Sequence, residues 1–357
     1  MDVIAGNYYL LDLQDGEQWV RELDRIRGLN PDLHYRPEYC GLFRDSGEPR
    51  LFVYREGNVS VIYPFLLRKI DPVSMPRIKT GQDLYDITSP YGYGGPLADA
   101  AADENVWDNF YGCFSGYCEK NDIITEFIRF HPLLGNHRRM TKHVQVERIS
   151  SVICVDLNQT DEKIWAGYKR NNRKNIKKAY REGLKVVLEE TPARFADFIS
   201  IYRHTMWRNQ AAKFYFFTDD FFDGIHQALS GHFLYAYTLL GGKVVSAELL
   251  LYNDTYIHSY LGGTLEQFYE YRPNNILKHE TIKWAKNRGI RFFLLGGGRS
   301  DGDGIYRYKL SFARDGVFDF YVGKKVHNFK AVEMLEKMMA ARKPREGGHY
   351  FPSYRRY

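Results

Sequence analysis

The clearest chemical pattern in the sequence is a cationic segment, residues 169–181, with the sequence KRNNRKNIKKAYR. It holds seven basic residues and no acidic one. At about 100° per residue, a helix spreads its basic side chains over one flank. The residues expected to bind phosphate are Arg170, Arg173, Lys174, Lys177 and Lys178. Such a face suits RNA or a polyphosphate, because phosphate binding releases condensed counterions. An ordinary solvated helix face is the alternative interpretation.

A second candidate for chemistry is a carboxylate in apolar surroundings. Glu248 interrupts the apolar run 244–251. A carboxylate is costly in such a place unless it is paired or has a catalytic role. Glu248 is therefore a candidate general base, with a structural role as the alternative.

A third pattern is the loop RSDGDG, residues 299–304, which matches the R/Q-x-x-G-x-G pattern of acyl-CoA-binding loops. In those loops, backbone amides before a helix hold the pyrophosphate. Here Asp301 and Asp303 would repel phosphate. The loop also leads into an aromatic and lysine-containing segment instead of a long helix. We therefore interpret the pattern as a chance match.

Other chemistries lack their motifs. The chain contains neither GxGxxG after a strand nor GxxxxGK[ST], which disfavours dinucleotide redox chemistry and nucleotide hydrolysis. The 11 histidines form no HExxH or HxH, so a metalloenzyme is also disfavoured. No two of the four cysteines form a CxxC pair; they are Cys40, Cys113, Cys118 and Cys154. We therefore expect free thiols and no metal site.

The elements that must position these residues alternate between helices and hairpins. Apolar spacing predicts helices over 15–27, 105–121, 161–182, 194–208 and 273–288. Hairpins are expected over 51–67 and 233–252, and further strands over 123–130, 152–157, 256–261 and 291–295. The two hairpins follow one order, which indicates a weak internal duplication. The expected fold class is α/β (α+β), with mixed sheets covered by helices.

Size and charge bound the class of protein. With 357 residues, the chain should form two domains: 1–150, and 151–319, with 320–357 returning to the first. The chain has 50 basic and 44 acidic residues, so its formal net charge is +6. This mild excess of positive charge favours polyanionic partners. Apolar stretches are shorter than the roughly 20 residues of a membrane-spanning helix, and the N-terminus carries no signal-peptide pattern. We expect a cytoplasmic protein without an integral membrane segment, and peripheral membrane contact stays open. The basic tail 342–357 is expected to be mobile.

Three segments together resemble a known family. The stretch RNNRKNIKKAYREGLKV (170–186) resembles the start of the second domain in the Fem family (FemABX) of peptidoglycan bridge-forming aminoacyltransferases. The segment GIYRYKLSF (304–312), after a helix, strand and glycine loop, is similar to that family's closing sequence. The loop SPYGYGGP (89–96) resembles the one in relatives that lack the coiled-coil arm. The resemblance implies two tandem GNAT-like domains, the fold of the GNAT acyltransferase superfamily, and no coiled-coil arm.

The resemblance also implies an activity and a set of partners. The reaction would be aminoacyl transfer from aminoacyl-tRNA to an amine of a peptidoglycan precursor. The acceptor would be nucleotide-linked or lipid-linked, with no DNA and no tightly bound cofactor. Lys309 would lie at the donor end of the cleft, where it could neutralise a tRNA phosphate or stabilise an oxyanion. Tyr308 stands where relatives often carry Phe.

The remaining site residues are also implied by the resemblance. Tyr260, Arg208 and Tyr215 would bind the acceptor, and Tyr91 and Tyr93 lie in the tyrosine-glycine loop. Asp86, just before that loop, is the second candidate base. For the tyrosines, packing is the competing interpretation.

Two other functions stay open at this point. One is acyl-CoA-dependent N-acylation in surface polysaccharide or natural-product assembly, and the other is a non-catalytic binding module with the same fold. The sequence leaves open the donor and its acyl group, the acceptor, the general base, the oligomeric state and the pathway.

Overall fold

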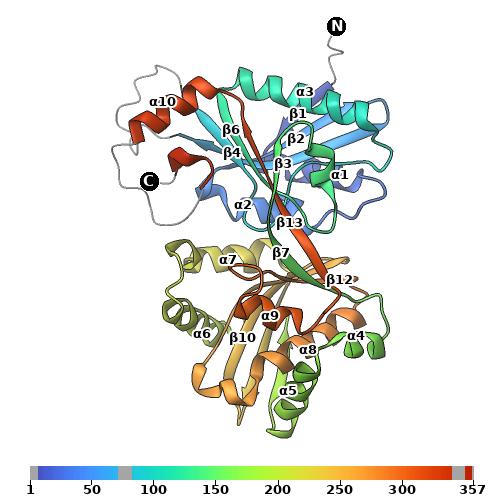
Figure 1. Ribbon diagram of the computed structural model, residues 1–357, viewed down its shortest axis with the longest axis vertical. Coiled ribbons are helices and arrows are strands. Elements are labelled where there is room, and N and C mark those ends of the chain that lie inside the picture. The colour runs from blue at the N-terminus through green and yellow to red at the C-terminus, as the bar shows by residue number, and fades with distance from the viewer. Residues whose placement is uncertain (1–6, 71–82, 340–349, 356–357) are drawn as a thin grey trace. The chain divides into compact units, whose positions relative to one another are not determined.

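The computed structural model describes residues 7–70, 83–339 and 350–355 (Figure 1). The chain divides into two compact units. Unit 1 comprises Met1–Ile149 and Phe320–Tyr357, and unit 2 comprises Ser150–Asp319. Each unit contains a mixed sheet covered by helices, which confirms the predicted fold class. Among the described residues, no helix combines the length and apolar character needed to cross a bilayer.

Unit 1 is built around six strands in the order β1-β2-β3-β4-β6-β13, with the short β5 paired to β3. Neighbours are antiparallel except β4 and β6, which are parallel. The elements are β1 Asn7–Leu11, α1 Gly16–Asp24, α2 Pro37–Gly41, β2 Glu48–Glu56, β3 Val59–Lys69, β4 Tyr85–Thr88, β5 Leu97–Ala98, α3 Glu104–Lys120, β6 Ile123–Arg129, β13 Val317–Val326 and α10 Phe329–Met339.

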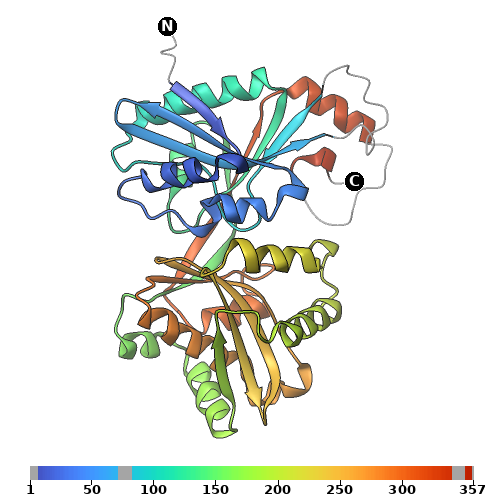
Figure 2. The ribbon, with the colours of Figure 1, turned by 180° about the vertical axis from the view of Figure 1, so that it is seen from behind.

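Helices cover both faces of this sheet (Figure 2). The alternation along β2 explains why, because successive side chains of a strand point to opposite faces. Phe52 and Tyr54 pack with α3, whereas Leu51 and Val53 pack with α1 and α2. Each face of the sheet therefore has its own apolar core.

Unit 2 has the same pattern of strand pairing, although the strand that corresponds to β13, namely β7, comes first and not last in the chain order of its unit. Its strands follow the order β7-β12-β11-β10-β9-β8, again with a single parallel pair, β11 and β12, joined through a helix. The predicted internal duplication is thus visible in the strand order. The elements are β7 Gln145–Asp156, α4 Asp161–Gly167, α5 Arg170–Arg181, β8 Lys185–Glu189, α6 Phe195–Arg208, α7 Asp219–Ala228, β9 Phe233–Leu240, β10 Lys243–Tyr252, β11 Tyr256–Thr264, α8 Pro273–Asn287, β12 Phe292–Gly296 and α9 Gly304–Leu310.

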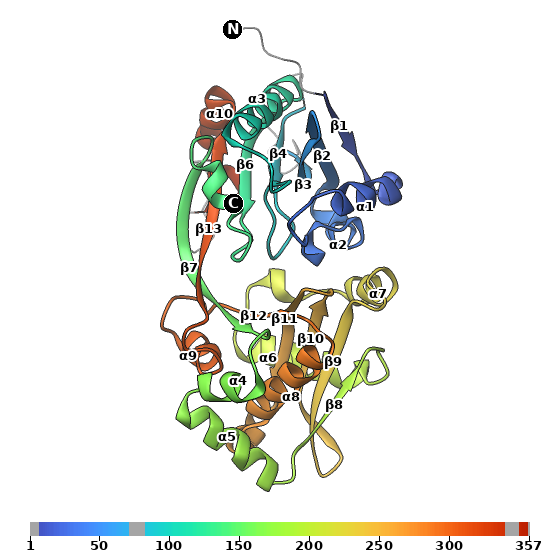
Figure 3. The same ribbon diagram turned by 90° about the vertical axis from the view of Figure 1, so that its right-hand side faces the viewer.

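The unit 2 sheet also separates two apolar layers. Leu234 and Ala236 of β9 face the core that α5 and α8 complete on one side (Figure 3). Tyr235, between them in the sequence, packs on Phe198 of α6, with 5.0 Å between ring centroids. Alternation along β9 therefore anchors helices on both faces.

The structure corrects the helix predicted over 161–182. That segment forms two helices, α4 and α5, with extended backbone at Tyr168 and Lys169. Tyr168 is fully buried and packs edge-to-face on Phe312, with 5.4 Å between centroids. Burying this side chain in the core outweighs the continuous helical pattern of the sequence.

The tail predicted to be mobile is only partly within the described residues. Where it is described, it packs on unit 1. Tyr354 is fully buried, and its hydroxyl donates to Asp86 at 3.0 Å. Residues 342–349 and 356–357 lie outside the described residues.

Candidate functional site

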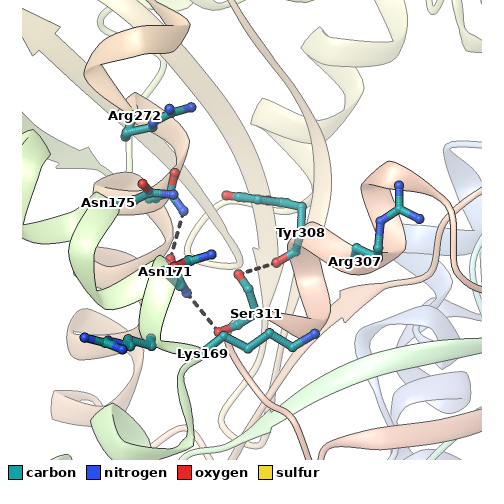
Figure 4. Close-up of a pocket in the computed structure, with 10 residues that line it drawn as sticks. Lys169, Asn171, Asn175, Arg272, Arg307, Tyr308 and Ser311 are labelled. Carbon is teal, nitrogen blue, oxygen red and sulfur yellow. Dashed lines mark hydrogen bonds between the residues drawn. The ribbon is translucent and has the colours of Figure 1, made fainter.

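A cavity of about 520 Å³ opens in unit 2 where α5 and α8 begin, beside α9 (Figure 4). In the figure, Asn171 and Asn175 of α5 lie across from Tyr308 of α9 and from Ser311, which follows α9. The lining residues are Lys169, Arg170, Asn171, Asn172, Asn175, Arg272, Asn275, Arg307, Tyr308 and Ser311.

The lining of this cavity is strongly cationic. It includes Lys169, Arg170, Arg272 and Arg307, and no described residue that lines it is acidic. The N-terminal ends of α5 and α8 add partial positive charge, because aligned peptide dipoles leave that sign at a helix start. The cavity is therefore suited to an anionic group such as phosphate.

A chain of amide hydrogen bonds fixes the walls of the cavity. The side-chain amide of Asn275 on α8 donates to the Asn172 side chain at 2.8 Å. Asn172 on α5 donates in turn to the carbonyl of Ser311, which follows α9, at 3.1 Å. The backbone N–H of Lys169 donates to the same carbonyl at 2.8 Å. Three elements far apart in sequence are thus held in one geometry.

The start of α8 differs from a pyrophosphate-binding turn. Arg272 adopts a left-handed conformation, with φ of 63°, and its N–H donates to the carbonyl of Tyr269. Pro273 has no N–H, and that of Asn275 donates to the carbonyl of Arg272. Three of the first four backbone positions therefore cannot donate to a ligand here. Side chains, rather than a nest of amides, supply the positive charge of the cavity.

A buried polar cluster lies in the same unit. Glu248 on β10 is 8% exposed and forms an ion pair with Lys278 on α8, which is 5% exposed. Ser259 on β11 donates to Glu248 and accepts from Lys278 Nζ at 2.5 Å. Glu248 is one of the two predicted general bases. In the structure its carboxylate is already engaged by an ammonium group and a hydroxyl.

Two predicted residues on α9 lie beside this cluster. Lys309 is half-buried, and its Nζ donates to the Gly297 carbonyl at 2.7 Å. Burial, and then the charge of Lys278, lower the pKa of Lys309 to about 8. The hydroxyl of Tyr308 donates to the Asn274 carbonyl at 2.9 Å, and burial followed by the nearby Glu248 raises the pKa of Tyr308. Tyr308 also lines the cavity.

A β-bulge marks the adjacent strand. Leu249 pairs with Leu261 and Leu250 pairs with Ser259, so Tyr260 is the extra residue of β11. Bulges are common beside active sites, where they redirect a side chain or interrupt strand pairing. The predicted Tyr260 is half-buried at this irregularity, one residue from Ser259.

The RSDGDG loop has a different use from the one its pattern suggests. The carboxylate of Asp303 accepts from the N–H groups of Arg299, Ser300 and Tyr306, at 2.6, 3.3 and 2.7 Å. It caps α9, which is only seven residues long. Three amides that could face a phosphate are therefore satisfied by a side chain of the protein.

The five predicted basic residues of α5 have separate environments. Arg170 lines the cavity, whereas Lys174 and Lys177 are exposed and Lys178 is half-buried. Arg173 turns back and donates to the carbonyls of Trp165, Ala166 and Tyr168, at 3.3, 3.1 and 2.5 Å. Arg173 therefore satisfies carbonyls at the end of α4, and the segment is not one uniform phosphate-binding face.

The predicted acceptor residues of α6 and the following loop also have partners in unit 2. Arg208 donates to the Thr264 carbonyl at 3.0 Å and to Glu266 at 2.8 Å. Its guanidinium lies 5.4 Å from the ring centroid of Tyr269. The carbonyl of Tyr215 accepts from Tyr202 at 2.5 Å, and the Tyr215 side chain is 37% exposed.

The other predicted residues belong to unit 1. Asp86 is fully buried and bound by Arg68 at 2.6 Å, Arg355 at 2.5 Å and Tyr354. This environment is that of a structural anchor. Tyr91 accepts through its carbonyl from Tyr39 at 2.5 Å. Tyr93 packs against the rings of His34 and His131, each 5.4 Å away.

Several residues of the site in unit 2 are not among the predicted site residues, above all Lys278, Arg272 and Asn172. Lys278 carried a usable signal, because its spacing to Ile282 and Ala285 places a lysine within the apolar stripe of α8. Helical spacing places Asn172 on the inward face of its helix, as the structure confirms, but the roles of Asn172, Asn275 and Arg272 in the cavity depend on helices that meet only in the folded unit.

Comparisons with known proteins agree with this architecture. Residues 166–310 match the family described as acetyltransferase (GNAT) domain. The crystal structure of FemX is similar over 92% of this chain and 100% of its own, with a TM-score of 0.66 and 12% identity. The structure of L-PGS from Bacillus licheniformis aligns with 92% of this chain over 98% of its own length, with a TM-score of 0.53 and 13% identity.

A third similar structure is a tandem GNAT protein from the clavulanic acid biosynthesis pathway. It covers 89% of this chain and 98% of its own, with a TM-score of 0.51 and 11% identity. No curated protein matches the sequence. At these identities, structural likeness establishes the fold.

The match of residues 166–310 to the GNAT acetyltransferase domain family indicates an acyltransferase, and the fold of the chain resembles that of a tandem GNAT protein. Unit 2 carries the GNAT acetyltransferase domain. The two-unit fold of the whole chain is of the Fem type, as the sequence resemblance implied.

Proposed function

We propose that the protein transfers an aminoacyl group from aminoacyl-tRNA to an amine of a peptidoglycan precursor or a related nucleotide-linked or lipid-linked acceptor. The observation that carries this proposal is the cationic cavity of unit 2, with Lys169, Arg170, Arg272 and Arg307 and no acidic residue among its described lining. Likeness in fold to FemX supports the choice of acceptor class.

The distribution of backbone donors favours tRNA over acyl-CoA as the donor. A CoA pyrophosphate is commonly held by consecutive amides at a helix start. At α8 three of the first four backbone positions have no N–H or donate it within the chain, and Asp303 accepts from the amides of Arg299, Ser300 and Tyr306. Flexible cationic side chains suit an RNA backbone, whose phosphates are bound through charge and counterion release.

The proposed reaction is aminolysis of an ester. The acceptor amine attacks the carbonyl carbon of the aminoacyl ester, a C–N bond forms, and the C–O bond to the ribose breaks. The negative charge that develops on the carbonyl oxygen requires a donor or a cation nearby. The bulge at Tyr260 and the ammonium form of Lys309 are the candidates in unit 2.

The test is binding of an aminoacylated tRNA acceptor-stem RNA and, separately, of acetyl-CoA, at two salt concentrations. Arg272→Ala and Arg307→Ala should each weaken RNA binding by roughly 10-fold or more, because hydrogen bonds to charged groups contribute about 1.5–3 kcal/mol. The salt dependence should also fall, as expected for a lost phosphate contact.

Arg44→Ala is the matched control, since Arg44 is an exposed arginine of unit 1 and the charge change is the same. RNA binding that is unaffected by either cavity variant would contradict the proposal. Tight acetyl-CoA binding without RNA binding would support the second candidate, acyl-CoA-dependent N-acylation, which the match to the acetyltransferase domain family favours. RNA binding without any transfer would indicate a binding module.

A further inference from the structure

Four exposed basic side chains form a single row on α5, which we call the α5 stripe. Its members are Arg170, Lys174, Lys177 and Arg181. At about 100° per residue they fall within a sector of roughly 60°, on the side of the helix opposite the buried Ala179. At 1.5 Å per residue the row extends roughly 16 Å along the helix axis.

The stripe is narrower than the basic face that the sequence predicts. Arg173 lies outside it, and its side chain donates to carbonyls at the end of α4. Lys178 lies on the other flank and is half-buried. The four stripe residues are therefore a distinct set, defined by their direction on the folded helix.

This arrangement works against the stability of α5. The four residues follow one another at spacings of three and four, where like charges repel on a helix. The first turn of α5 has no acidic residue, and Lys169 at its N-cap makes no capping hydrogen bond through its side chain. Cations at a helix start also oppose the helix dipole. Local rules broken in this way are typical of functional sites, and a bound polyanion would relieve the repulsion.

The protein itself does not neutralise these charges. Within the described residues, none of the four side chains has an ion-pair or hydrogen-bond partner. Exposed cations on other helices of unit 2 are paired. Arg203 on α6 binds Asp219 at 2.6 Å, and Lys283 on α8 binds Glu280 at 3.1 Å. The α5 stripe is therefore available to a ligand.

The stripe begins at the cationic cavity (Figure 4). Arg170, its first member, lines the cavity together with Asn171 and Asn175 of the same helix. Arg181, at the other end of α5, is not part of the cavity lining. The positive charge of the cavity therefore continues along one side of α5, beyond the cavity.

The surroundings of the stripe favour RNA over a membrane. A membrane-binding helix presents an exposed apolar face beside its basic face. On α5, Ile176 and Ala179 are fully buried, and the hydroxyl of the partly exposed Tyr180 donates to Glu280 of α8. A single row of cations beside a cavity fits one nucleic-acid strand, bound through its phosphates.

We propose that the α5 stripe binds the phosphates of the RNA strand whose 3′ end occupies the cavity, so that this strand runs along α5 from Arg170 to Arg181. This inference rests on the proposed use of aminoacyl-tRNA. The aminoacyl ester is carried by the 3′ end of a tRNA, so the strand leaves the cavity in the 3′ to 5′ direction. Successive phosphates then meet the four stripe residues in sequence order.

The test compares two single-stranded RNAs that share one 3′ end and are three and twelve nucleotides long. Binding to the full chain is measured at several salt concentrations. Arg181→Ala should weaken binding of the longer RNA roughly threefold or more and lower its salt-dependence slope by about 0.7, the contribution of one phosphate on a single strand. The shorter RNA should be unaffected, because its phosphates end before Arg181. Arg170→Ala should weaken both RNAs.

Two further variants separate RNA binding from a merely solvated helix face. Arg203→Ala is the matched control, since it removes an exposed arginine of unit 2 that already has a partner, and it should change neither affinity. Lys174→Gln relieves repulsion at spacings of three and four, so it should raise the midpoint of thermal unfolding while weakening the longer RNA. A solvated face would give the higher midpoint with unchanged RNA binding, which would overturn the inference.

The remaining outcomes distinguish this inference from the proposed function. Equal losses for both RNAs in Arg181→Ala would overturn the path along α5. If Arg272→Ala still weakened RNA binding in that case, the proposed function would keep its support. Length-dependent losses without any aminoacyl transfer would support the stripe and contradict the transfer. Sedimentation with phosphatidylglycerol vesicles is the last measurement: binding that the stripe variants lose, with no effect on RNA, would assign the stripe to a membrane and overturn the inference.

Discussion

At the residue scale, the pairing of Lys278 with Glu248 has a consequence for stability. Removing one member of a buried ion pair leaves the other charge without a partner, which typically costs about 3–5 kcal/mol. We expect Lys278→Met to lower the free energy of unfolding by this amount. Lys278→Met/Glu248→Gln should recover at least half of the loss, because no buried charge is left. Urea unfolding of the three proteins measures both values.

Equal losses in the single and double variants would show that the pair is not coupled. A neighbouring contrast supports the choice of residues. Lys283 and Glu280 are also an ion pair on α8, but Lys283 is 51% exposed, and such pairs contribute about 0–1 kcal/mol. Lys283→Met should therefore change the free energy of unfolding little.

Only one member of this ion pair, Glu248, could be predicted from the sequence. A glutamate in an apolar strand is conspicuous, so Glu248 was identified as either paired or catalytic, and the structure shows the pairing. Lys278 was missed because lysine is common in helices and its long apolar stem tolerates an apolar stripe. Two opposite charges in two apolar patterns, 30 residues apart, are a signal that could have joined them.

At the scale of elements, the amide chain through Asn172 should hold the cavity together. Asn172→Ala leaves the Asn275 amide and the Ser311 carbonyl without this partner. A buried polar group without a partner costs about 1–3 kcal/mol. We expect a loss of that size in urea unfolding and a parallel loss of RNA binding, because the starts of α5 and α8 are no longer fixed.

Asn171→Ala is the control for this prediction. Asn171 is exposed, lines the same cavity and precedes Asn172 on α5. Its removal should leave the free energy of unfolding nearly unchanged. If both asparagine variants behaved alike, the amide chain would not be what holds the three helices in place.

Most elements of both units could be predicted from apolar spacing, including the two hairpins that reveal the duplication. The break between α4 and α5 could not. The pattern from 161 to 182 fits one helix, and only the burial of Tyr168 against Phe312, 144 residues further along the chain, requires extended backbone there. A single helix would also give the basic segment one continuous charged face. Because the helix is broken, the side chain of Arg173 instead donates to carbonyls at the end of α4.

At the scale of the whole molecule, charge alone is a weak guide to function. The formal net charge is only +6, yet four cations line one cavity of unit 2 without an acidic neighbour in its described lining. Local concentration of charge raises the potential at a site far more than the sum over the chain does. The cavity therefore carries the proposal, and the overall basicity adds little to it.

The path of the chain gives the last prediction. The chain builds most of unit 1, then unit 2, and returns to unit 1 with β13, α10 and residues 350–355. Asp86 on β4 ties this return in place, because Arg355 and Tyr354 bind its carboxylate together with Arg68. Asp86→Asn removes the charge and should destabilise unit 1 by about 3 kcal/mol, as expected for breaking a buried pair.

Hydrogen exchange of the full chain tests this prediction by region. In Asp86→Asn, amides of β4 and of residues 350–355 should exchange faster, while those of β10 and β11 in unit 2 should keep their protection, since each unit has its own core. Asp83→Asn is the control, because Asp83 pairs with Lys69 and both side chains are 51% exposed. Faster exchange throughout both units would contradict separate cores. A loss of turnover in Asp86→Asn without faster exchange would return Asp86 to the role of general base, which its two arginine partners argue against.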